Sequence, residues 1–473
     1  MGVRPPRLAA DSDDWLQEQR HDPHRRHGTP GVTNAASDPA GRREWCQRSE
    51  PPREPDAEPT EPDQPTAWAG QATLRQVEVA FYAGAPFHAA VTSVESLDPA
   101  AYGIPTEDRE RILSPALVIF LDQVRANLRT LLGYVDGNAD RLRPHIKTTK
   151  LPRVFVEIAR AGIRHYKCAT TREAEQLLTV LEAQAVAGDL LVAYGHLEPA
   201  LSQLTDLATR FPRMRVSVLC EDADLVDAIP DSLGIFVDVN PGMNRTGIEM
   251  SRRDAILAVA ERAEGRFRGI HHYEGHIHAG SFEERQALAI PLHDALIELV
   301  EATESAGCPV GEVVTSGTPS FRAALMHDGL DHLAPRHRVS PGTVVYSDLR
   351  TQSCEELDFV PAALVFSRVI AHPGPALVTV DAGSKAIAAE AGAPIAEALG
   401  FPHLAARTPS EEHLPFDAPT DPPPLGTPIL LVPRHVCPTV NLAEEAVLVE
   451  GGRVIGIAPV SARAHDIWVG ERP

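Results

Sequence analysis

Arg-Pro-His-Ile-Lys-Thr-Thr-Lys, residues 143–150, places a lysine, Lys147, in what the residue pattern predicts to be a buried strand. Side chains alternate between the two faces of a strand, so every second residue from Arg143 to Lys147 shares one basic face. If this strand is the first of a βα barrel, its carboxyl end opens into the active site. An ε-amine removed from water there loses its proton more easily and can form a Schiff base with an aldehyde. The alternative is a lysine paired with a carboxylate, and Lys150 and Lys167 compete for any catalytic role.

The composition limits the class of protein and its partners. With 473 residues and 43% hydrophobic content, the chain is long enough for two folded domains and a tail. The formal net charge of -21 argues against nucleic acid or an anionic membrane surface as a partner, because like charges repel. No apolar run is long enough to span a membrane, and the N-terminus lacks the apolar core of a signal peptide.

The cysteines indicate a reducing compartment. They are scattered along the chain without a CxxC pair, which does not suit a disulfide framework. The six residues are Cys46, Cys168, Cys220, Cys308, Cys354 and Cys437. We therefore expect a cytoplasmic protein.

Three regions of different composition divide the chain. Residues 1–75 are dense in Pro, Gly and charged residues, cannot offset their ordering entropy by burial, and are predicted to be disordered. From about residue 112, β-branched runs alternate with amphipathic stretches, which predicts an α/β barrel of the (β/α)8 TIM type over residues 112–350. Residues 355–473 contain short strands punctuated by Gly, Pro and Asp, which predicts a smaller, mostly antiparallel β domain. The apolar strand 115–121 belongs either to the barrel or to this second domain.

Eight candidate strands supply the predicted barrel, which is the number that closes one. They span residues 143–147, 164–169, 189–194, 214–220, 233–239, 267–276, 311–316 and 337–345. Between them, Thr170 opens a capping-box pattern, and Ser251 and Ser281 are expected to cap the next two long helices. In the second domain, residues 446–449 and 454–458 flank a tight turn and predict a hairpin.

His435 and Cys437 form a candidate metal pair after a predicted strand. On an extended backbone they project to the same side, about 7 Å apart by strand rise. Imidazole nitrogen and thiolate sulfur together suit zinc, and two protein ligands leave positions open for water and substrate, as in a catalytic site. The alternative is an ordinary buried histidine and a buried cysteine.

A second histidine-rich segment contains His276 and His278, with His271 and His272 just upstream. A His-x-His pair on a barrel strand can bind metal, which keeps a metal-dependent hydrolase open as an alternative. No other predicted strand supplies an evident set of His and Asp partners for a two-metal centre. We therefore expect these rings to stack on a flat cofactor or to donate hydrogen bonds in the pocket.

Three glycine-bearing loops follow predicted strands. In residues 238–247, Arg245 would stand at the barrel mouth as a fixed cation for a carboxylate or a cofactor oxygen. Residues 315–320 (Thr-Ser-Gly-Thr-Pro-Ser) and 340–343 (Ser-Pro-Gly-Thr) follow the last two barrel strands. Hydroxyls and free N–H groups at that place form the usual phosphate cradle of such barrels. Ordinary turn formation is the alternative for each loop.

Taken together, these motifs resemble those of the D-serine dehydratase and D-threonine aldolase family, which are fold type III pyridoxal-phosphate enzymes built like alanine racemase. The resemblance covers about residues 112–470. It rests on SPALV (114–118), RPHIKTTK (143–150), DVNPGMNRTG (238–247), YEGH (273–276), TSGTPS (315–320), PGTVVYSD (341–348), DAGSKA (381–386), SEEH (410–413) and HVCPTVNL (435–442).

The resemblance implies a cofactor and a metal. It implies that Lys147 carries pyridoxal 5'-phosphate as a Schiff base, and that Zn²⁺ or another divalent metal binds to His435 and Cys437. The other residues implied to bind the cofactor are Arg245, Tyr273, His276, Ser316, Gly317, Thr318, Gly342 and Thr343. It also implies a small-molecule D-amino acid substrate and a homodimer.

The chain departs from the family pattern at three positions. Thr149 stands where the family commonly has histidine, and Ser316 replaces one glycine of the usual Gly-Gly-Thr-Pro. Ser340 stands where alanine racemases have the arginine that contacts the pyridine nitrogen. An unprotonated pyridine is a weaker electron sink, which favours elimination over racemisation.

The activity that the resemblance implies is a lyase reaction on D-3-hydroxy amino acids. We expect D-serine dehydratase-type elimination to a 2-oxo acid and ammonia, with the free amine of Lys147 as general base. The alternative is D-threonine aldolase-type cleavage to glycine and an aldehyde. Cys437 favours elimination, because an acidic residue at that position resembles the aldolases. An amino-acid racemase, a metal-dependent barrel hydrolase and a non-catalytic cofactor carrier are more distant alternatives.

Overall fold

The computed structural model describes residue 94 and residues 97–470. The extension predicted to be disordered, residues 1–75, lies outside the described residues, as does Cys46. The five cysteines within the described part are all free, as predicted. No helix in this part of the chain is long and apolar enough to cross a bilayer.

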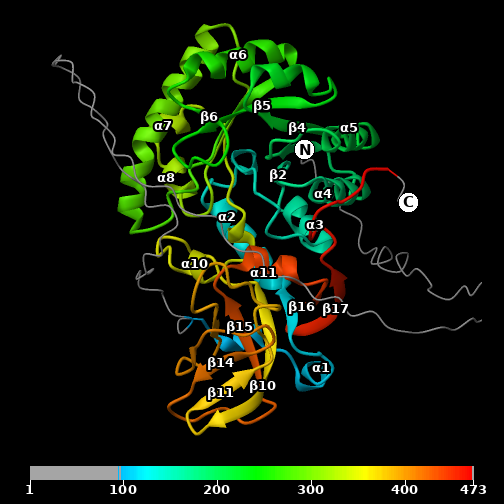
Figure 1. Ribbon diagram of the computed structural model, residues 1–473, viewed down its shortest axis with the longest axis vertical. Helices are drawn as coiled ribbons and strands as arrows, with labels where there is room; N and C mark the ends of the chain where they lie inside the picture. The colour runs from blue at the N-terminus through cyan, green and yellow to red at the C-terminus, as the bar shows by residue number, and fades with distance from the viewer. Residues whose placement is uncertain (1–93, 95–96, 471–473) are drawn as a thin grey trace, which may run out of the picture. The chain divides into compact units, whose positions relative to one another are not determined.

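One part of the fold is a parallel sheet that is surrounded by helices (Figure 1). Its strands, in spatial order, are β2 (His165–Cys168), β3 (Gly188–Val192), β4 (Met214–Cys220), β5 (Gly234–Asn240), β7 (Phe267–His272), β8 (Glu312–Thr315) and β9 (His337–Val339), and the short β6 (Ile248–Glu249) pairs with β5. The helices along it are α3 (Pro152–Arg160), α4 (Thr171–Ala183), α5 (Ala200–Arg210), α6 (Arg253–Ala263), α7 (Phe282–Ser305), α8 (Phe321–Leu325) and α9 (Asp328–Asp331). The predicted alternation of strands and helices is confirmed.

The segment from Leu142 to Ile146 closes this sheet into a barrel. The amide of Arg143 donates to the carbonyl of Val339 on β9 at 2.9 Å, and the amide of Ile146 donates to the carbonyl of Lys167 on β2 at 2.8 Å. Isolated parallel bridges at Leu142 and His145 mark the same contacts. The barrel wall therefore consists of eight segments, as predicted. Seven are regular strands, and the segment from Leu142 to Ile146 is irregular.

The prediction of a regular strand over residues 143–147 is wrong. Pro144 has no N–H for a ladder, and the chain turns at Ile146, whose carbonyl accepts from the amides of Thr149 and Lys150. Lys147 is therefore half-buried in a turn at the end of the segment rather than inside a strand. Its place at the carboxyl end of the barrel agrees with the expectation.

Local signals in the sequence were confirmed in part. The side chain of Thr170 caps α4, and Ser281 caps α7 within a full capping box. The predicted cap at Ser251 is wrong, because α6 begins at Arg253 after Arg252 and has no side-chain cap. The last barrel strand ends at Val339 rather than residue 345, and the 3-10 turn η7 (Thr343–Val345) follows it.

A second, mostly antiparallel sheet contains both the first and the last strand of the described chain. Its main path is β13 (Ala405–Ala406), β14 (Leu414–Asp417), β11 (Leu377–Val380), β10 (Ala363–Gly374), β1 (Ala116–Phe120), β16 (Glu445–Glu450) and β17 (Arg453–Pro459), while β15 (Pro428–Pro433) pairs with β10 and β12 (Ala396–Ala398). β1 lies antiparallel to β10 and parallel to β16, so this strand belongs to the second sheet and not to the barrel. The predicted hairpin is confirmed as β16 and β17. The helices beside this sheet are α2 (Leu121–Gly133), α10 (Leu349–Gln352) and α11 (Val436–Leu442).

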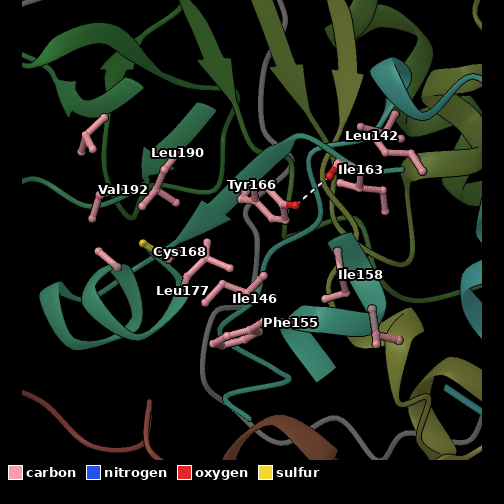
Figure 2. Close-up of a cluster of buried hydrophobic side chains, with 14 of the residues drawn as sticks. Leu142, Ile146, Phe155, Ile158, Ile163, Tyr166, Cys168, Leu177, Leu190 and Val192 are labelled. Carbon is pink, nitrogen blue, oxygen red and sulfur yellow. Dashed lines mark hydrogen bonds between the residues drawn. The ribbon is translucent and has the colours of Figure 1, made fainter. Parts of the chain in front are cut away.

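Apolar side chains fill the space between the strands and the outer helices (Figure 2). Tyr166 on β2 points outward into this core, and its hydroxyl donates to the carbonyl of Ile163 at 2.7 Å. Around it lie Leu142, Ile146, Phe155, Ile158, Leu177 and Leu190, none of which is exposed. Each such residue contributes about 1.5–3 kcal/mol by leaving water. Because Tyr166 points outward, its neighbour Lys167 must point into the barrel.

The floor of the barrel is a buried ion network around Arg143. The guanidinium donates to both carboxylate oxygens of Glu312 at 2.6 Å and to Asp189 at 2.7 Å. Both carboxylates stand near the amino ends of their strands, so Arg143 points away from the mouth. The expectation that Arg143 adds to a basic face at the active site is wrong, because these carboxylates neutralise it.

Arg143→Met should lower the free energy of unfolding by about 3–5 kcal/mol, because it leaves two buried carboxylates without their shared partner. Urea denaturation measures this change. The matched control is Arg253→Met, which removes an ion pair with Glu298 on the surface and should change stability by less than about 0.5 kcal/mol. Equal effects of the two substitutions would contradict the role given to the network.

Candidate active site

Two lysines meet at the carboxyl end of the barrel. Lys167 is only 2% exposed, and its Nζ lies 3.4 Å from Nε2 of His271. His271 is in turn 2.7 Å from Asp238 through its Nδ1. Burial and, after it, the charge of Lys147 lower the pKa of Lys167 to about 7. The two amines are therefore close enough for their charges to interact.

The ring of Tyr273 lies between two cations in this mouth. The guanidinium carbon of Arg245 is 4.9 Å from the ring centroid, and Nζ of Lys167 is 5.4 Å from it. A Cβ on Gly317 would lie 3.0 Å from the ring, so this loop packs directly against Tyr273. The structure thus brings together three of the residues predicted to line the cofactor pocket.

His276 lies on the same rim. A Cβ on Gly242 would be 3.7 Å from its Nε2, which places the loop of Arg245 beside this imidazole. The buried Nδ1 of His276 has no hydrogen-bond partner among the described residues. Burial lowers the pKa of His276, so the ring is neutral near pH 7. It is available as a hydrogen-bonding group, as the sequence predicts.

The loop after β8 offers one free hydroxyl. Ser316 donates its amide to Glu274 at 3.2 Å and its hydroxyl to Thr315 at 3.0 Å, so both of its hydrogens are committed and it does not fit the predicted phosphate role. Thr318, by contrast, has a buried hydroxyl without a partner among the described residues. A buried polar atom of this kind calls for a ligand or a water molecule.

The carboxylate of Glu274 holds this loop in place by accepting from the amide of Ser316. The sequence alone did not reveal this role. Glu274 is fully buried between His272 and His293, whose ring nitrogens lie 3.5 and 3.6 Å from its oxygens. Although burial opposes ionisation, the interaction with these two nearby imidazoles holds the pKa of Glu274 well below its usual range. His293 comes from α7, so only the fold reveals this partner.

The loop after β9 contacts both the segment that carries Lys147 and the predicted metal pair, His435 and Cys437. A Cβ on Gly342 would come within 2.5 Å of the carbonyl oxygen of His145, so only glycine allows the two backbones this close. The hydroxyls of Thr148 and Thr343 lie 3.1 and 3.5 Å from Sγ of Cys437. The predicted metal pair is therefore at the barrel mouth, beside the residue that follows Lys147.

The expectation that His435 and Cys437 lie on an extended backbone is wrong. His435 is the N-cap of α11 and Cys437 lies in the first turn of that helix. The amide of Val436 between them donates to the buried carboxylate of Asp348 at 3.0 Å, which fixes the turn. The two side chains still face each other, since a hydrogen bond between them is one cause of both pKa shifts below.

Glu390 orients the imidazole of this pair. Its carboxylate lies 2.6 Å from Nδ1 of His435, which leaves Nε2 for a metal, and this is how metal-binding histidines are usually held. Although burial opposes charge on His435, its hydrogen bond with Cys437 raises its pKa to about 9. Burial likewise opposes ionisation of Cys437, but the His435 partner lowers the pKa of the thiol. The thiolate form that metals require is therefore favoured.

Two other candidate groups have ordinary structural roles. The amine of Lys150 donates to Glu173 at 2.6 Å and to the carbonyl of Ala462. These contacts give it a structural role, so it does not compete with Lys147 for the catalytic role. His165 lies near Asp189 and Glu312 at a spacing that suits a metal ion. Those carboxylates already bind Arg143, so this cluster at the floor does not fit a metal site.

Comparison with known proteins agrees with this geometry. Residues 119–349 match the family model of the alanine racemase N-terminal domain, and residues 362–449 match that of the serine dehydratase domain. The chain belongs to the D-serine dehydratase and D-threonine aldolase family. This family consists of pyridoxal-phosphate lyases with an alanine-racemase-like barrel.

Individual family members span most of the chain. A D-threonine aldolase of Arthrobacter sp is 26% identical over an alignment 389 residues long, which covers 76% of this chain and 96% of the relative. The crystal structure of D-threonine aldolase from Filomicrobium marinum is 27% identical in sequence and has a TM-score of 0.68. The match covers 78% of this chain and 99% of that structure. D-threo-3-hydroxyaspartate dehydratase from Delftia sp. shares the fold at 22% identity and a TM-score of 0.65, over 76% of this chain and 99% of its own.

The residues at the mouth fit the family's cofactor. Pyridoxal phosphate needs an amine, a surface for its flat ring and donors for its phosphate. Lys147 could provide the amine, Tyr273 the ring surface, and the hydroxyl of Thr318, which has no partner among the described residues, a donor. The donor set of His435 and Cys437, backed by Glu390, fits a divalent metal in the same way.

Gly342→Ala should destabilise the protein by about 1–3 kcal/mol, because the added methyl group overlaps the carbonyl of His145 and must push the lysine segment away. Thermal unfolding measures the effect. Gly195→Ala is the control, since no atom lies within 4 Å of the added Cβ there. If the two variants melt alike, the close approach is not required.

Proposed function

We propose that this protein is a pyridoxal-phosphate and metal-dependent lyase that acts on D-3-hydroxy amino acids and eliminates the β-hydroxyl group to give a 2-oxo acid and ammonia. The observation that supports this most strongly is the 3.1 Å contact between the hydroxyl of Thr148 and Sγ of Cys437. It supports a shared site for the proposed metal pair and the amine of Lys147, the residue before Thr148. An amine and a Lewis acid in reach of one small substrate are what this reaction requires.

Bound pyridoxal phosphate would supply an electron-accepting ring, and a bound divalent metal would supply a Lewis acid for the leaving oxygen. Lys147 is the residue that would hold the cofactor by its aldehyde carbon. Its free amine would then remove the proton from the substrate Cα. Tyr273 and Arg245 would cover the ring, while Thr318 and Gly342 would face the phosphate. Gly317 would leave room for the phosphate rather than donate to it, because its amide donates to the hydroxyl of Ser320 at 3.3 Å.

Thr343 is better placed to support the metal pair than the phosphate, because its hydroxyl lies 3.5 Å from Sγ of Cys437. His276, with an unpartnered Nδ1 at the rim, would bind a polar group of the cofactor or substrate. The homodimer and the cytoplasmic location stay predictions of the sequence.

The metal pair and the loop after β9 favour elimination. Cys437 supplies a sulfur ligand where the resemblance associates an acidic residue with aldolases. Ser340, at the position of the racemase arginine, donates its hydroxyl to the carbonyl of Arg143 at 2.8 Å, so this serine offers no cation to a pyridine nitrogen. A weaker electron sink disfavours the long-lived carbanion that racemisation needs.

Retro-aldol cleavage to glycine and an aldehyde is the second candidate. It is supported by the similarity to D-threonine aldolases, at 26–27% identity across most of the chain. The same residues would serve both reactions. Elimination breaks the bond between the β-carbon and its hydroxyl oxygen, whereas retro-aldol cleavage breaks the bond between the α-carbon and the β-carbon.

Wild-type protein loaded with pyridoxal phosphate and zinc should form keto acid and ammonia from a panel of D-3-hydroxy amino acids. Lys147→Ala should abolish the visible absorbance of the lysine-bound cofactor and reduce turnover by at least about 10³-fold, since both depend on this amine. Lys385→Ala is the control, because that lysine lies on the surface with Glu411 and Glu412. Glycine from D-threonine without any keto acid would support the second candidate, whereas a colourless, inactive wild type would refute both.

Cys437→Ala should leave less than one tightly bound metal per chain after dialysis, because it removes one of two protein ligands. Glu390→Gln should weaken metal affinity by about 10–100-fold, since it loses the carboxylate behind His435. Metal analysis by mass spectrometry measures both. Cys308→Ala serves as the control, because that cysteine is buried against the barrel core. Equal metal content in all variants would place the metal elsewhere.

A further inference from the structure

The use of lysine in this chain is unusual. Of the 44 basic residues other than histidine, four are lysines: Lys147, Lys150, Lys167 and Lys385. Lys150 and Lys385 are paired with carboxylates. Among the described residues, no carboxylate oxygen lies within 4.0 Å of the amine of Lys147 or Lys167. Arginine cannot lose its proton in the physiological range and lysine can, so two lysines without carboxylate partners at one barrel mouth point to amine chemistry.

Lys167 is held in the same irregular part of the barrel as Lys147. Its amide donates to the carbonyl of Pro144 at 3.1 Å, and its carbonyl accepts from Ile146 at 2.8 Å. These bonds fix Lys167 against the segment that carries Lys147. The side chain points inward, because the adjacent Tyr166 points outward into the helical layer (Figure 2).

The contacts of Lys167 have a defined direction. Asp238 only accepts hydrogen bonds, so Nδ1 of His271 carries the hydrogen across the 2.7 Å contact between them. Burial lowers the pKa of His271, which leaves the ring neutral with a lone pair on Nε2. That lone pair accepts from Nζ of Lys167 at 3.4 Å. His271 thus positions the amine without neutralising its charge, which a carboxylate in the same place would do.

The charges around Lys167 come from every element packed against it. They are Lys147, His145 and Arg143 on the closing segment, Arg245 on the loop after β5, Asp238 on β5, and His271 and Glu274 on β7 and the residues after it. Burial and the three other cations lower the pKa of Lys167 to about 7, against the opposing effect of Glu274. The amine is therefore half protonated near neutral pH and mostly neutral above pH 8.

We propose that Lys167 is a second amine of the active site, positioned by His271 and Asp238, that takes up the proton which Lys147 removes from the substrate. The proposal rests on the proposed function, in which Lys147 acts as the base. In this step the N–H bond of the Lys147 ammonium breaks, a new N–H bond forms on the lone pair of Lys167, and one positive charge moves between the amines. Lys147 is again neutral afterwards, and no redox partner is needed.

The titration of Lys167 can be measured without cofactor or activity. In apoprotein labelled with 13C at the lysine ε-carbons, four signals are expected, and one should titrate near pH 7 while ordinary lysines titrate near ~10.4. Lys167→Met should remove that signal and so assign it. Asp238→Asn should shift it down by about one pH unit, because the loss of the carboxylate lets His271 present a hydrogen to Lys167. Four signals that all titrate above pH ~9 would overturn the proposal, and this test uses the wild type even if Lys167→Met does not fold.

Cofactor-loaded protein separates the proposal from the function on which it rests. Borohydride reduction and peptide mapping should place the cofactor on Lys147 in the wild type, in Lys167→Met and in Lys167→Arg. In both variants kcat should fall by about 10²-fold. The increase of kcat with pH near 7 should also disappear, because neither methionine nor arginine can exchange a proton in that pH range. Label on Lys167 instead would overturn both the proposal and the assignment of Lys147. Label on Lys147 with an unchanged pH profile in the variants would overturn the proposal alone.

Discussion

The site depends on the hydrogen bonds by which residues 142–146 bridge the two edges of the parallel sheet. The amides of Arg143 and Ile146 bind β9 and β2, and no regular strand is present between them. Because Pro144 and the turn at Ile146 interrupt the ladder, this segment ends early and leaves Lys147 at the rim. The same short segment sends Arg143 to the floor and Lys147 to the mouth.

Along its axis the barrel separates charge into layers. At the floor, the guanidinium of Arg143 is matched by the carboxylates of Asp189 and Glu312, so this layer is neutralised within the protein. Above it, Leu191, Leu219, Phe236 and Val314 form an apolar cluster that excludes water. At the mouth, Lys147, Lys167 and Arg245 form no ion pair with a carboxylate of the described residues, and Tyr273 interacts with two of these cations. The lower layers therefore support a positively charged rim that suits an anionic cofactor and substrate.

The sequence predicted the regular strands well and the irregular parts poorly. β4 was predicted with its observed bounds, because Val216 and Val218 alternate with polar neighbours in the period of a strand. The closing segment was not, since its turn depends on hydrogen bonds to β9 and β2. Lys147 and Cys437 were picked out by local pattern, but the partners Glu390 and Asp348 approach from distant parts of the chain. Ser316 shows the opposite error, because a plausible loop residue has both hydrogens taken by Glu274 and Thr315.

The position of β1 has a consequence for biosynthesis. This strand is made before the barrel, yet its neighbours β10 and β16 are made after it. Val118 and Phe120 pack with Leu364, Phe366 and Val447 as well as with the earlier residue Tyr102, so part of their apolar surface is covered only after the barrel has been made. The first and last strands of the described chain, β1 and β17, therefore belong to one sheet, and the barrel lies between them in the sequence. A nascent chain that stalls after the barrel would present an unpaired apolar strand, the kind of surface that chaperones bind and aggregation exploits.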